Sequence, residues 1–391
     1  MFDVVIVGGG MVGSACAAGL AEQGMSVAMI EASPPAAYDP QQPPDLRVSA
    51  ISAKSEALLS SLGAWSYVQA MRLCPYRRLS VWEQPKGRTD FNCADLNKSH
   101  LGHIVENRVI QLALHQVIAT LPNVRCFWRE KIVSLTLTGW PEIRLQSGEL
   151  IKAKVIIGAD GIHSMVRQAA DIGVTGWQYS QHALGITIKT DGPQQDITWQ
   201  QFTPQGPLAF LPLYDGFASL VWYGAAPHLD ALKRLSDSQL KQQILQHFPQ
   251  ELPDFSIIDK ASFPLTRMHA RRYFNGPCVL VGDAAHGINP LAGQGLNLGF
   301  KDVDALLQSF APLRDKWQHS DNISELVHAW FTQYEQARRR DNLLMMSAMD
   351  CLYAGFANNL APLKILRNLG LSLAQRAGPL KQHVMKYAMG L

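Results

Sequence analysis

The sequence is poor in charge and has no long apolar run, and each shortage excludes a class of protein. Charged side chains make up 17% of the 391 residues, and the formal net charge is only +3. This charge is too small for a nucleic-acid-binding surface, and no basic recognition motif with interleaved aromatics occurs. No apolar stretch reaches the roughly 18 residues of a spanning helix, and the amino terminus lacks the basic start of a secretory signal. We therefore expect a protein that folds in the cytoplasm and binds no nucleic acid.

Cysteine is also scarce. The six cysteines are scattered and form no C-x-x-C pair, so their spacing indicates neither a zinc site nor a disulfide framework. We expect a reducing compartment and no metal. Apolar residues, in contrast, make up 47% of the chain, which is enough to fill a sizeable core, and the length exceeds one ordinary domain.

The amino terminus carries the pattern of a dinucleotide-binding turn. A predicted strand, residues 3–7, runs into Gly8-x-Gly10-x-x-Gly13 and a helix. In this context Gly8 permits the tight turn, Gly10 lets the backbone approach a pyrophosphate, and Gly13 lets the helix pack on the strand. A second strand delivers Glu31, whose carboxylate suits the ribose hydroxyls of an adenosine and argues against NADP. The choice between NAD and FAD stays open from this end of the chain.

Two further strands end in polar turns. The apolar run 279–281 predicts a strand that ends at Gly282-Asp283, and residues 290–295 form a glycine-rich loop that begins a helix. The free backbone N–H groups at the amino end of such a helix can bind the carbonyl oxygen of a ring edge or a phosphate oxygen. Each such interaction is favourable by roughly 0.3–1 kcal/mol. Asp283 can hold a sugar hydroxyl. The third strand, residues 155–158, ends at Asp160 in the same way.

Three motifs together resemble the single-component FAD aromatic hydroxylases of the para-hydroxybenzoate hydroxylase fold. They are the first glycine motif with Glu31, the stretch from Gly158 to Arg167, and Gly282-Asp283 with Pro290 and Gly293-Gln-Gly-Leu-Asn297. Within that group, Arg47-Val-Ser-Ala-Ile-Ser52 resembles the ubiquinone-biosynthesis hydroxylases. The ending Lys386-Tyr-Ala-Met-Gly-Leu391 is similar to the branch that hydroxylates 2-polyprenyl-3-methyl-6-methoxy-1,4-benzoquinol. The resemblance covers essentially the whole chain.

The resemblance implies an α/β fold with a Rossmann-like FAD domain and an interleaved antiparallel-sheet substrate domain, followed by a helical carboxyl-terminal segment. The alternating pattern between residues 183 and 263 also predicts an antiparallel sheet. We assign residues 1–74, 98–180 and 264–305 to the FAD domain. Residues 75–97 and 181–263 are assigned to the substrate domain, and residues 306–391 to the helical region.

The resemblance also implies FAD as cofactor and NAD(P)H as co-substrate. The implied cofactor-binding residues are Gly8, Gly10, Val12, Gly13, Glu31, Arg47, Arg108, Asp160, Asp283, Pro290, Gly293, Gln294, Gly295, Leu296 and Asn297. Among them, Asp283 would bind the ribitol, and Pro290 would lie beside the reactive carbon of the flavin. Asp160 has a second interpretation, in which its hydrogen bonds close its own turn. The flavin supplies the difficult chemistry, so we assign no catalytic side chain.

Pocket residues and His286 have competing interpretations. His286 is most simply a packed, hydrogen-bonded histidine, and a catalytic role is the alternative. The pocket candidates from the predicted sheet are Phe210, Leu211, Trp222 and Tyr223, but one register slip would exchange the two faces of the sheet. Their orientation therefore stays open.

The implied substrates are a polyprenyl quinol and O2, and the implied pathway is ubiquinone biosynthesis. The segment after Asp350 has no acidic residue but carries Lys364, Arg367, Arg376, Lys381 and Lys386. This pattern suits peripheral contact with the inner membrane or with a biosynthetic complex, and equally a solvated face packed on the core.

Several alternatives stay open. The same chemistry can act at another ring position, or on a small soluble aromatic acid, which an arginine clamp in the pocket would favour. A flavin-binding scaffold subunit without turnover is a rival of another class. Halogenation is disfavoured because no W-x-W-x-I-P-like segment follows the first motif. The sequence does not distinguish NADH from NADPH, the prenyl length or the oligomeric state.

Overall fold

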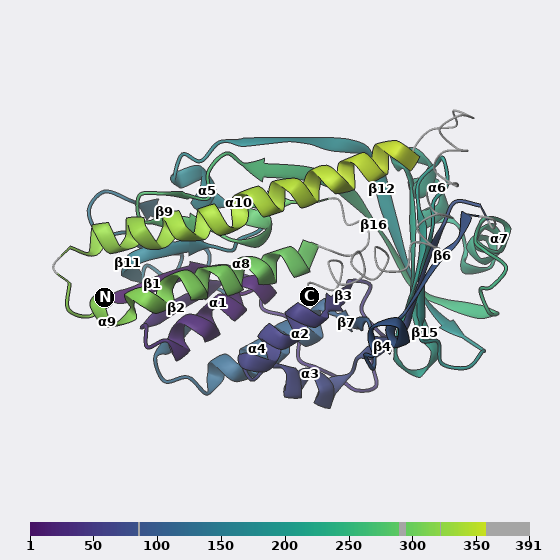
Figure 1. The fold of residues 1–391 in the computed structure, drawn as a ribbon, viewed down its shortest axis with the longest axis horizontal. Helices are drawn as coiled ribbons and strands as arrows, with labels where there is room; N and C mark the ends of the chain where they lie inside the picture. Colours follow the sequence, from purple (N-terminus) through teal and green to yellow (C-terminus); the bar gives the residue numbers. More distant parts are fainter. Residues whose placement is uncertain (85–86, 289–294, 321, 357–391) are drawn as a thin grey trace.

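Two large sheets dominate the part of the chain that the structure, a computed structural model, describes: residues 1–84, 87–288, 295–320 and 322–356 (Figure 1). The first sheet has the order β17-β18-β11-β1-β2-β8, and a hairpin of β9 and β10 extends it from β11. Its strands are β1 (Phe2–Val7), β2 (Val27–Glu31), β8 (Val124–Trp128), β9 (Ile132–Thr136), β10 (Glu142–Leu145), β11 (Leu150–Gly158), β17 (Phe274–Asn275) and β18 (Cys278–Leu280).

The middle of the first sheet is parallel, because its strands are apolar on both faces. β1 pairs in parallel with β11 and β2, and β11 pairs in parallel with β18. Val4, Val5 and Ile6 are all buried, as expected for a parallel strand covered by helices on both faces. The carboxyl ends of β1, β11 and β18 therefore meet at one edge, where Gly8, Asp160 and Asp283 follow them.

Helices cover this sheet and connect it to a smaller one. They are α1 (Met11–Glu22), α2 (Ala53–Ser61), α3 (Trp65–Met71), α4 (Asn107–Ala119), α5 (Met165–Ala169), α8 (Gly295–Phe310), α9 (Arg314–Trp317) and α10 (Ile323–Phe356). The residues of α1 from 13 to 21 are all buried, so α1 is a core helix rather than an amphipathic surface one. The smaller sheet has the order β3-β7-β4 and consists of β3 (Val48–Ser52), β7 (Gly102–Glu106) and β4 (Cys74–Tyr76).

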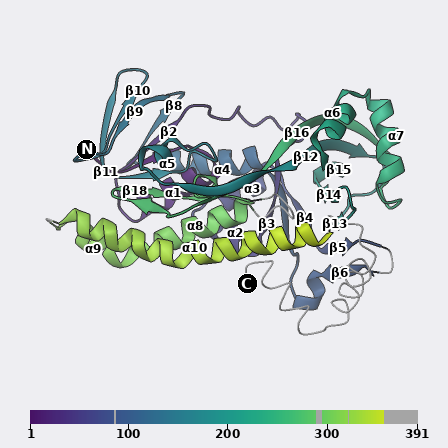
Figure 2. The ribbon, with the colours of Figure 1, turned by 90° about the horizontal axis from the view of Figure 1, so that it is seen from above.

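The second large sheet has the order β19-β16-β12-β15-β14-β13-β5-β6. Its strands are β5 (Arg78–Trp82), β6 (Thr89–Asn92), β12 (Val174–Thr190), β13 (Ile197–Gln201), β14 (Leu208–Pro212), β15 (Phe217–Ala225), β16 (Phe255–Ala270) and β19 (His286–Gly287). Its pairs are antiparallel except that of β13 with β5. Two helices, α6 (Ala226–Arg234) and α7 (Asp237–His247), pack beside it, as Figure 2 shows.

Two long strands connect the sheets. β12 and β16 pair from Val174 with Ala270 at one end to Thr190 with Phe255 at the other, and both figures show them reaching between the two halves (Figures 1 and 2). Helix α10 runs beside both halves, since Tyr334 bonds the end of β18 and Asp350 bonds Tyr179 of β12. The predicted α/β fold class with an interleaved sheet and a helical segment is confirmed. Among the described helices, none is long and apolar enough to cross a bilayer.

Candidate functional site

The first glycine motif forms a tight turn between β1 and α1. Gly8 has φ +101°, and a Cβ there would lie 2.5 Å from the carbonyl oxygen of Ala159. A Cβ on Gly13 would lie 1.9 Å from the carbonyl oxygen of Gly8, so the helix approaches the strand closely. A Cβ on Gly10, in contrast, would meet no protein atom within 4 Å. Gly10 therefore borders open space at the amino end of α1, where a phosphate group could approach.

Side chains from β2 and α4 fix the loop around Gly9. Glu31 at the end of β2 accepts hydrogen bonds from the backbone N–H of Gly9 at 2.7 Å and of Ser33 at 2.6 Å. Gln111 Nε2 donates to the Gly9 carbonyl at 2.8 Å, and His115 Nε2 contacts the same oxygen at 2.9 Å. The loop is thus held from both sides. Gln111 and His115 were not predicted, because only their position on α4 brings them to the loop.

Arg47 and Arg108 lie on segments that flank this loop. Arg47 directly precedes β3 and is exposed, with its guanidinium 5.0 Å from the ring centre of Phe263. Arg108 is at the start of α4 and bonds Asp45 through Nε at 2.8 Å. Its buried second terminal nitrogen, Nη2, has no hydrogen-bond partner within the described residues. An unpartnered guanidinium nitrogen is costly, and an anionic ligand such as a phosphate would satisfy it.

Asp160 caps helix α5. Its carboxylate accepts hydrogen bonds from the hydroxyl of Ser164 at 2.5 Å and from the N–H groups of Met165 and Val166 at 2.7 and 3.3 Å. Desolvation by burial raises the pKa of Asp160, and these hydrogen bonds act in the opposite direction. The geometry supports the interpretation in which Asp160 closes its own turn. Its neighbour Arg167 was given no role from the sequence.

Arg167 joins the second motif to the third. Its guanidinium is buried and donates to the carbonyls of Ile162 at 2.7 Å and Ala284 at 2.9 Å. Asp283 itself is exposed at the end of β18. Desolvation raises the pKa of Asp283, whereas the charges of His286 and Arg47 act in the opposite direction. An exposed carboxylate beside a cationic side chain can accept hydrogen bonds from the hydroxyls of a ligand.

The first and third motifs also contact each other. A Cβ on Gly282 would lie 3.3 Å from the side chain of Val12, and a Cβ on Gly299 would lie 2.7 Å from it. The Val12 side chain thus packs between the two turns, and its role in cofactor binding stays a prediction. The structure brings Gly8, Gly10, Val12, Gly13 and Asp283 to one edge of the first sheet.

The start of α8 is tied to β3 and α2 through one side chain. Asn297 Oδ1 accepts hydrogen bonds from the Ser52 N–H at 3.0 Å and the Ser55 hydroxyl at 2.7 Å, and Nδ2 donates to the Ala50 carbonyl at 2.8 Å. Its amide is therefore occupied by the protein. Gly295 is the first residue of α8, and Leu296 packs on the main core. Pro290, Gly293 and Gln294 lie outside the described residues.

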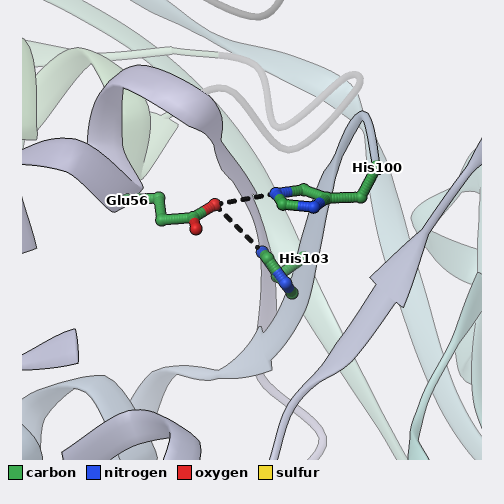
Figure 3. A group of neighbouring side chains, drawn as sticks. All are labelled: Glu56, His100 and His103. Atoms are coloured by element: carbon green, nitrogen blue, oxygen red, sulfur yellow. Dashed lines mark hydrogen bonds and ion pairs between the residues drawn. The ribbon is translucent and has the colours of Figure 1, made fainter. Parts of the chain in front are cut away.

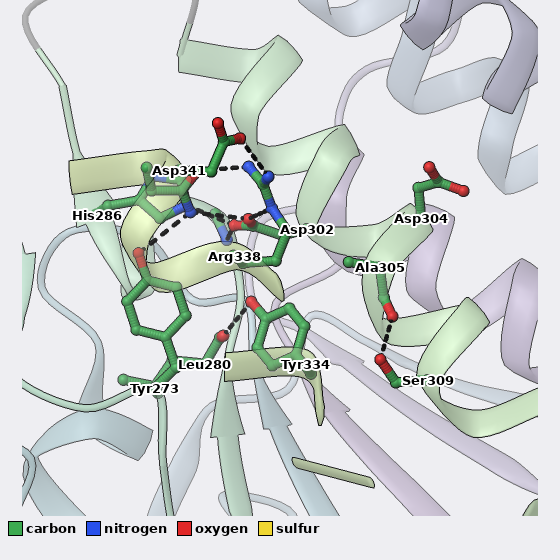
Figure 4. A network of polar contacts seen from close by, with 12 residues as sticks. Tyr273, Leu280, His286, Asp302, Asp304, Ala305, Ser309, Tyr334, Arg338 and Asp341 are labelled. Carbon is green, nitrogen blue, oxygen red and sulfur yellow. Dashed lines mark hydrogen bonds and ion pairs between the residues drawn. The ribbon is translucent and has the colours of Figure 1, made fainter. Parts of the chain in front are cut away.

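A buried polar network lies directly behind the Gly282 turn (Figure 4). Asp302 of α8 contacts His286, accepts from the Gly282 N–H at 3.1 Å, and accepts from Arg338 and Asn342 of α10 at 2.9 Å each. Burial alone would raise the pKa of Asp302, but His286 and Arg338 lower it to about 2. His286 is completely buried, which supports its interpretation as a packed histidine. The importance of Asp302 could not be predicted, because its partners are distant in sequence.

The pocket candidates divide between the two faces of the second sheet. Phe210 stacks on Trp199, and Trp222 packs edge-on against Phe248 within the core beside α6 and α7. Tyr223 instead clusters with Ala183 and Leu265 on the other face. Leu211, one residue after Phe210, is half-buried and lies on that same other face. All four stay predictions, and we take Leu211 and Tyr223, on the face opposite α6 and α7, as the candidates for the ring pocket.

The residues at this edge fit FAD. The space beside Gly10 suits a pyrophosphate, the Arg108 nitrogen without a partner among the described residues suits an anionic oxygen, and the exposed carboxylate of Asp283 suits the hydroxyls of a ligand. Glu31 lies at the end of β2, where a carboxylate reaches an adenosine ribose.

Comparison with known proteins agrees with this site. A family model described as an FAD binding domain matches residues 1–321. The chain is 46% identical to the 3-demethoxyubiquinol 3-hydroxylase of Escherichia coli (strain K12), over 100% of this chain and 98% of that protein. It is 32% identical to the mitochondrial ubiquinone biosynthesis monooxygenase COQ6 of Mus musculus, over 99% and 91%.

A solved structure supports the fold. The p-nitrophenol 4-monooxygenase PnpA from Pseudomonas putida DLL-E4 matches with a TM-score of 0.78 at 16% identity, covering 99% of this chain and 98% of that one. The family that the motifs resemble, its enzymatic nature and its FAD cofactor are thereby confirmed. The chain belongs to the ubiquinone-biosynthesis hydroxylases of the FAD-dependent aromatic hydroxylase family.

Proposed function

We propose that the protein hydroxylates the ring of 2-polyprenyl-3-methyl-6-methoxy-1,4-benzoquinol, with O2 and NAD(P)H as co-substrates. The observation that carries this proposal is the 46% identity, from end to end, with a 3-demethoxyubiquinol 3-hydroxylase. The name demethoxyubiquinol describes a quinol that lacks one methoxy group, which agrees with the proposed ring. Bound FAD, reduced by NAD(P)H, supplies the activated oxygen for such a reaction.

The protein's own residues bind the cofactor and keep water from it. Gly8, Gly10 and Gly13 form the cradle for the pyrophosphate, Glu31 holds the ribose of the adenosine, and Arg108 offers an unpartnered guanidinium nitrogen. We propose that Asp283, which follows β18, and Arg47, which precedes β3, lie on the flavin side of the cradle. We propose Asp160 as a positioning residue for this edge, because it caps α5.

We propose that contacts with the substrate ring, rather than a channel for the prenyl tail, determine which substrate the protein selects. Each isoprene unit could contribute roughly 3–4 kcal/mol against water, at about 0.8 kcal/mol for each buried CH2. A prenyl tail already dissolved in a bilayer gains almost nothing by that transfer. We propose that Leu211 and Tyr223, on the face of the second sheet opposite α6 and α7, contact the ring. The basic segment beyond residue 356 is proposed to contact the membrane or a partner protein.

A small aromatic acid is the main alternative substrate, and a hollow in the second sheet bears on it. The hollow is lined by Trp82, Trp199 and Phe210 together with Arg78 and Arg88. Arg78 already pairs with Asp196, and Arg88 with Asp90 and Glu251. These arginines have carboxylate partners within the protein, so this hollow offers no clamp for a substrate carboxylate.

Mass spectrometry of the quinone fraction tests the proposal. Cells that lack the gene should accumulate a polyprenyl quinone that carries the ring methyl and one methoxy group but lacks the final hydroxylation. The plasmid-borne gene should restore the normal profile. Accumulation of an earlier intermediate would move the assignment to another ring position, and an unchanged profile would contradict a role in this pathway.

The same cells also distinguish an active hydroxylase from a flavin-binding scaffold subunit without turnover. The Gly10→Val variant should fail to restore the profile, because its side chain would fill the pyrophosphate space. Full restoration by a variant shown to contain no flavin would favour the scaffold. Steady NAD(P)H oxidation by the purified wild-type protein, together with its absence from the Gly10→Val variant, would exclude the scaffold role.

A further inference from the structure

A group of three potential metal ligands lies outside the flavin edge, between α2 and β7 (Figure 3). Glu56 comes from the first turn of α2, His103 from β7, and His100 from the segment just before β7. One carboxylate oxygen, Glu56 Oε2, lies 3.0 Å from His100 Nε2 and 3.2 Å from His103 Nδ1. The three ligand atoms all lie within 4.8 Å of one another.

These spacings suit a small transition-metal ion. Zinc binds histidine nitrogen at about 2.0–2.1 Å and carboxylate oxygen at about 2.0–2.2 Å, so the ligand atoms of a tetrahedral site lie roughly 3.3 Å apart. The two measured separations from Glu56 approach that value. Two imidazoles with one carboxylate are ligands that zinc prefers, whereas magnesium and calcium prefer oxygen alone.

The state of His103 points to a missing ligand. His103 is 7% exposed, and its Nδ1 has Glu56 Oε2 at 3.2 Å as an ion-pair partner but makes no well-aligned hydrogen bond with the described residues. A poorly aligned contact satisfies such a nitrogen only in part. A bound cation would satisfy it, because the lone pair of a neutral imidazole is a metal ligand.

The surroundings orient both rings. Trp65 packs edge-on against His103 at 5.0 Å between ring centres, and the His100 ring lies 4.3 Å from the His103 ring. Ser99 Oγ lies 2.9 Å from His100 Nδ1, which leaves Nε2 directed to Glu56. Such partners of the outer nitrogen fix the orientation of a histidine ligand. The side chains of His100 and Glu56 are 24% and 22% exposed, so an ion can enter from solvent.

We propose that Glu56, His100 and His103 bind one divalent transition-metal ion of the zinc class, with water in the fourth position. The ion ties α2 to β7. α2 begins with Ser52 and Ser55, which hold Asn297, and β7 leads into α4 with Arg108. Metal binding at this site therefore braces two elements that border the flavin edge, and it takes no part in electron transfer.

Titration calorimetry with zinc chloride tests the site on the FAD-loaded enzyme after dialysis against a chelator. We expect one zinc ion for each chain. His103→Ala and Glu56→Gln should each weaken binding at least about tenfold, since even outer-shell changes cost that much. The matched control is His319→Ala, an exposed histidine after α9, and it should bind zinc as the wild type does.

Thermal unfolding gives a second readout that does not depend on turnover. Zinc should raise the Tm of the wild type and of His319→Ala above that in chelator, and at the same zinc concentration it should raise the Tm of Glu56→Gln clearly less. Glu56→Gln keeps the size of the side chain, so it serves if His103→Ala fails to fold. The absence of zinc binding to the wild type, or equal binding by wild type and Glu56→Gln, would overturn the proposal. Neither result bears on the hydroxylase proposal.

Discussion

Gly10 allows the cofactor cradle to be blocked without disturbing the fold. A Cβ at this position meets no atom of the described residues within 4 Å, and the backbone there, at φ −68°, is accessible to any L residue. Gly10→Val should therefore lose nearly all bound FAD while the free energy of unfolding of the apoprotein changes by less than about 0.5 kcal/mol. Flavin absorbance of the purified protein and thermal unfolding check the two parts.

A matched control is Gly355→Ala in α10, far from the first glycine motif, where an added Cβ meets no atom of the described residues within 4 Å. It should keep a full complement of flavin. Normal flavin content in Gly10→Val would show that the pyrophosphate lies elsewhere.

Arg108 should contribute to FAD affinity through its unpartnered nitrogen. A hydrogen bond to a charged group is worth about 1.5–3 kcal/mol, so Arg108→Met should weaken FAD binding roughly 10- to 150-fold. Fluorescence titration of the apoprotein with FAD measures this change. Arg125→Met, which removes an exposed partner of Glu149, should leave FAD affinity unchanged, and equal losses in both variants would contradict a specific role.

At the scale of single residues, the sequence predicts what depends on neighbours along the chain. The roles of Gly8 and Gly13 follow from strand, turn and helix in register, and their close contacts agree with those roles. It could not predict that Val12 fills the gap between two turns, or that Asn297 uses its amide on Ser52 and Ser55. These contacts join residues more than two hundred positions apart. The pair His100 and His103 is visible in the sequence, but Glu56 is not recognisable as its partner.

Among the elements, α8 holds the Gly282 turn through the buried charge of Asp302. Removing one partner of a buried ion pair costs about 3–5 kcal/mol because the other charge is left alone. Asp302→Asn should therefore lower the free energy of unfolding by up to that amount, since Arg338 would lose its fully buried carboxylate and keep only the more exposed Asp341. Chemical denaturation measures it.

Asp304→Asn is the control on the same helix. Its partner Lys54 is half-exposed at 3.2 Å, and such a surface pair is worth less than about 1 kcal/mol. Similar losses for Asp302→Asn and Asp304→Asn would show that the network does not stabilise the fold.

His269 on β16 should make stability fall in mild acid. Desolvation, with the charges of His286 and Arg339, lowers the pKa of His269 to about 4 from an ordinary value near 6.5. Below pH 6.5 the unfolded chain takes up a proton that the folded chain does not, so the free energy of unfolding decreases until pH 4, by about 3 kcal/mol. Denaturation at several pH values measures the slope.

The substitution His269→Gln should flatten this slope between pH 6.5 and 4. His247→Gln, an exposed histidine at the end of α7, should leave the slope as it is. An unchanged slope in His269→Gln would assign the acid sensitivity to other groups.

The elements that the sequence predicts well are those with a strong apolar period. The strands at β1, β11 and β18 and the helix α4 follow from buried runs and from alternation with turn residues. Pairing partners do not follow from such patterns. β5 comes from a much earlier segment of the chain and pairs in parallel with β13 inside an otherwise antiparallel sheet. The local periodicity of a segment carries no information on which distant strand it pairs with.

For the whole molecule, β12 and β16 should make the two halves unfold together. The two strands pair along most of their length, and β16 also pairs with β19 directly after the Asp283 turn. Urea unfolding should therefore show one transition, with flavin release and loss of far-ultraviolet circular dichroism at the same midpoint. Two separate transitions would show that the sheets are independent units. The domain boundaries proposed from the sequence stay a prediction until then.

The order of strands in the first sheet also sets the timing of its assembly during synthesis. β1 is made first and occupies the middle of the sheet, but its neighbour β11 is made much later, since Ile6 pairs with Ile157. At roughly 5–20 residues per second, the ribosome needs about 8–30 s to supply that neighbour. For this interval one side of β1 is an unpaired edge whose residues 4–7 are all apolar, which is the kind of edge that aggregates. The newly made chain thus exposes this strand edge before any flavin site exists.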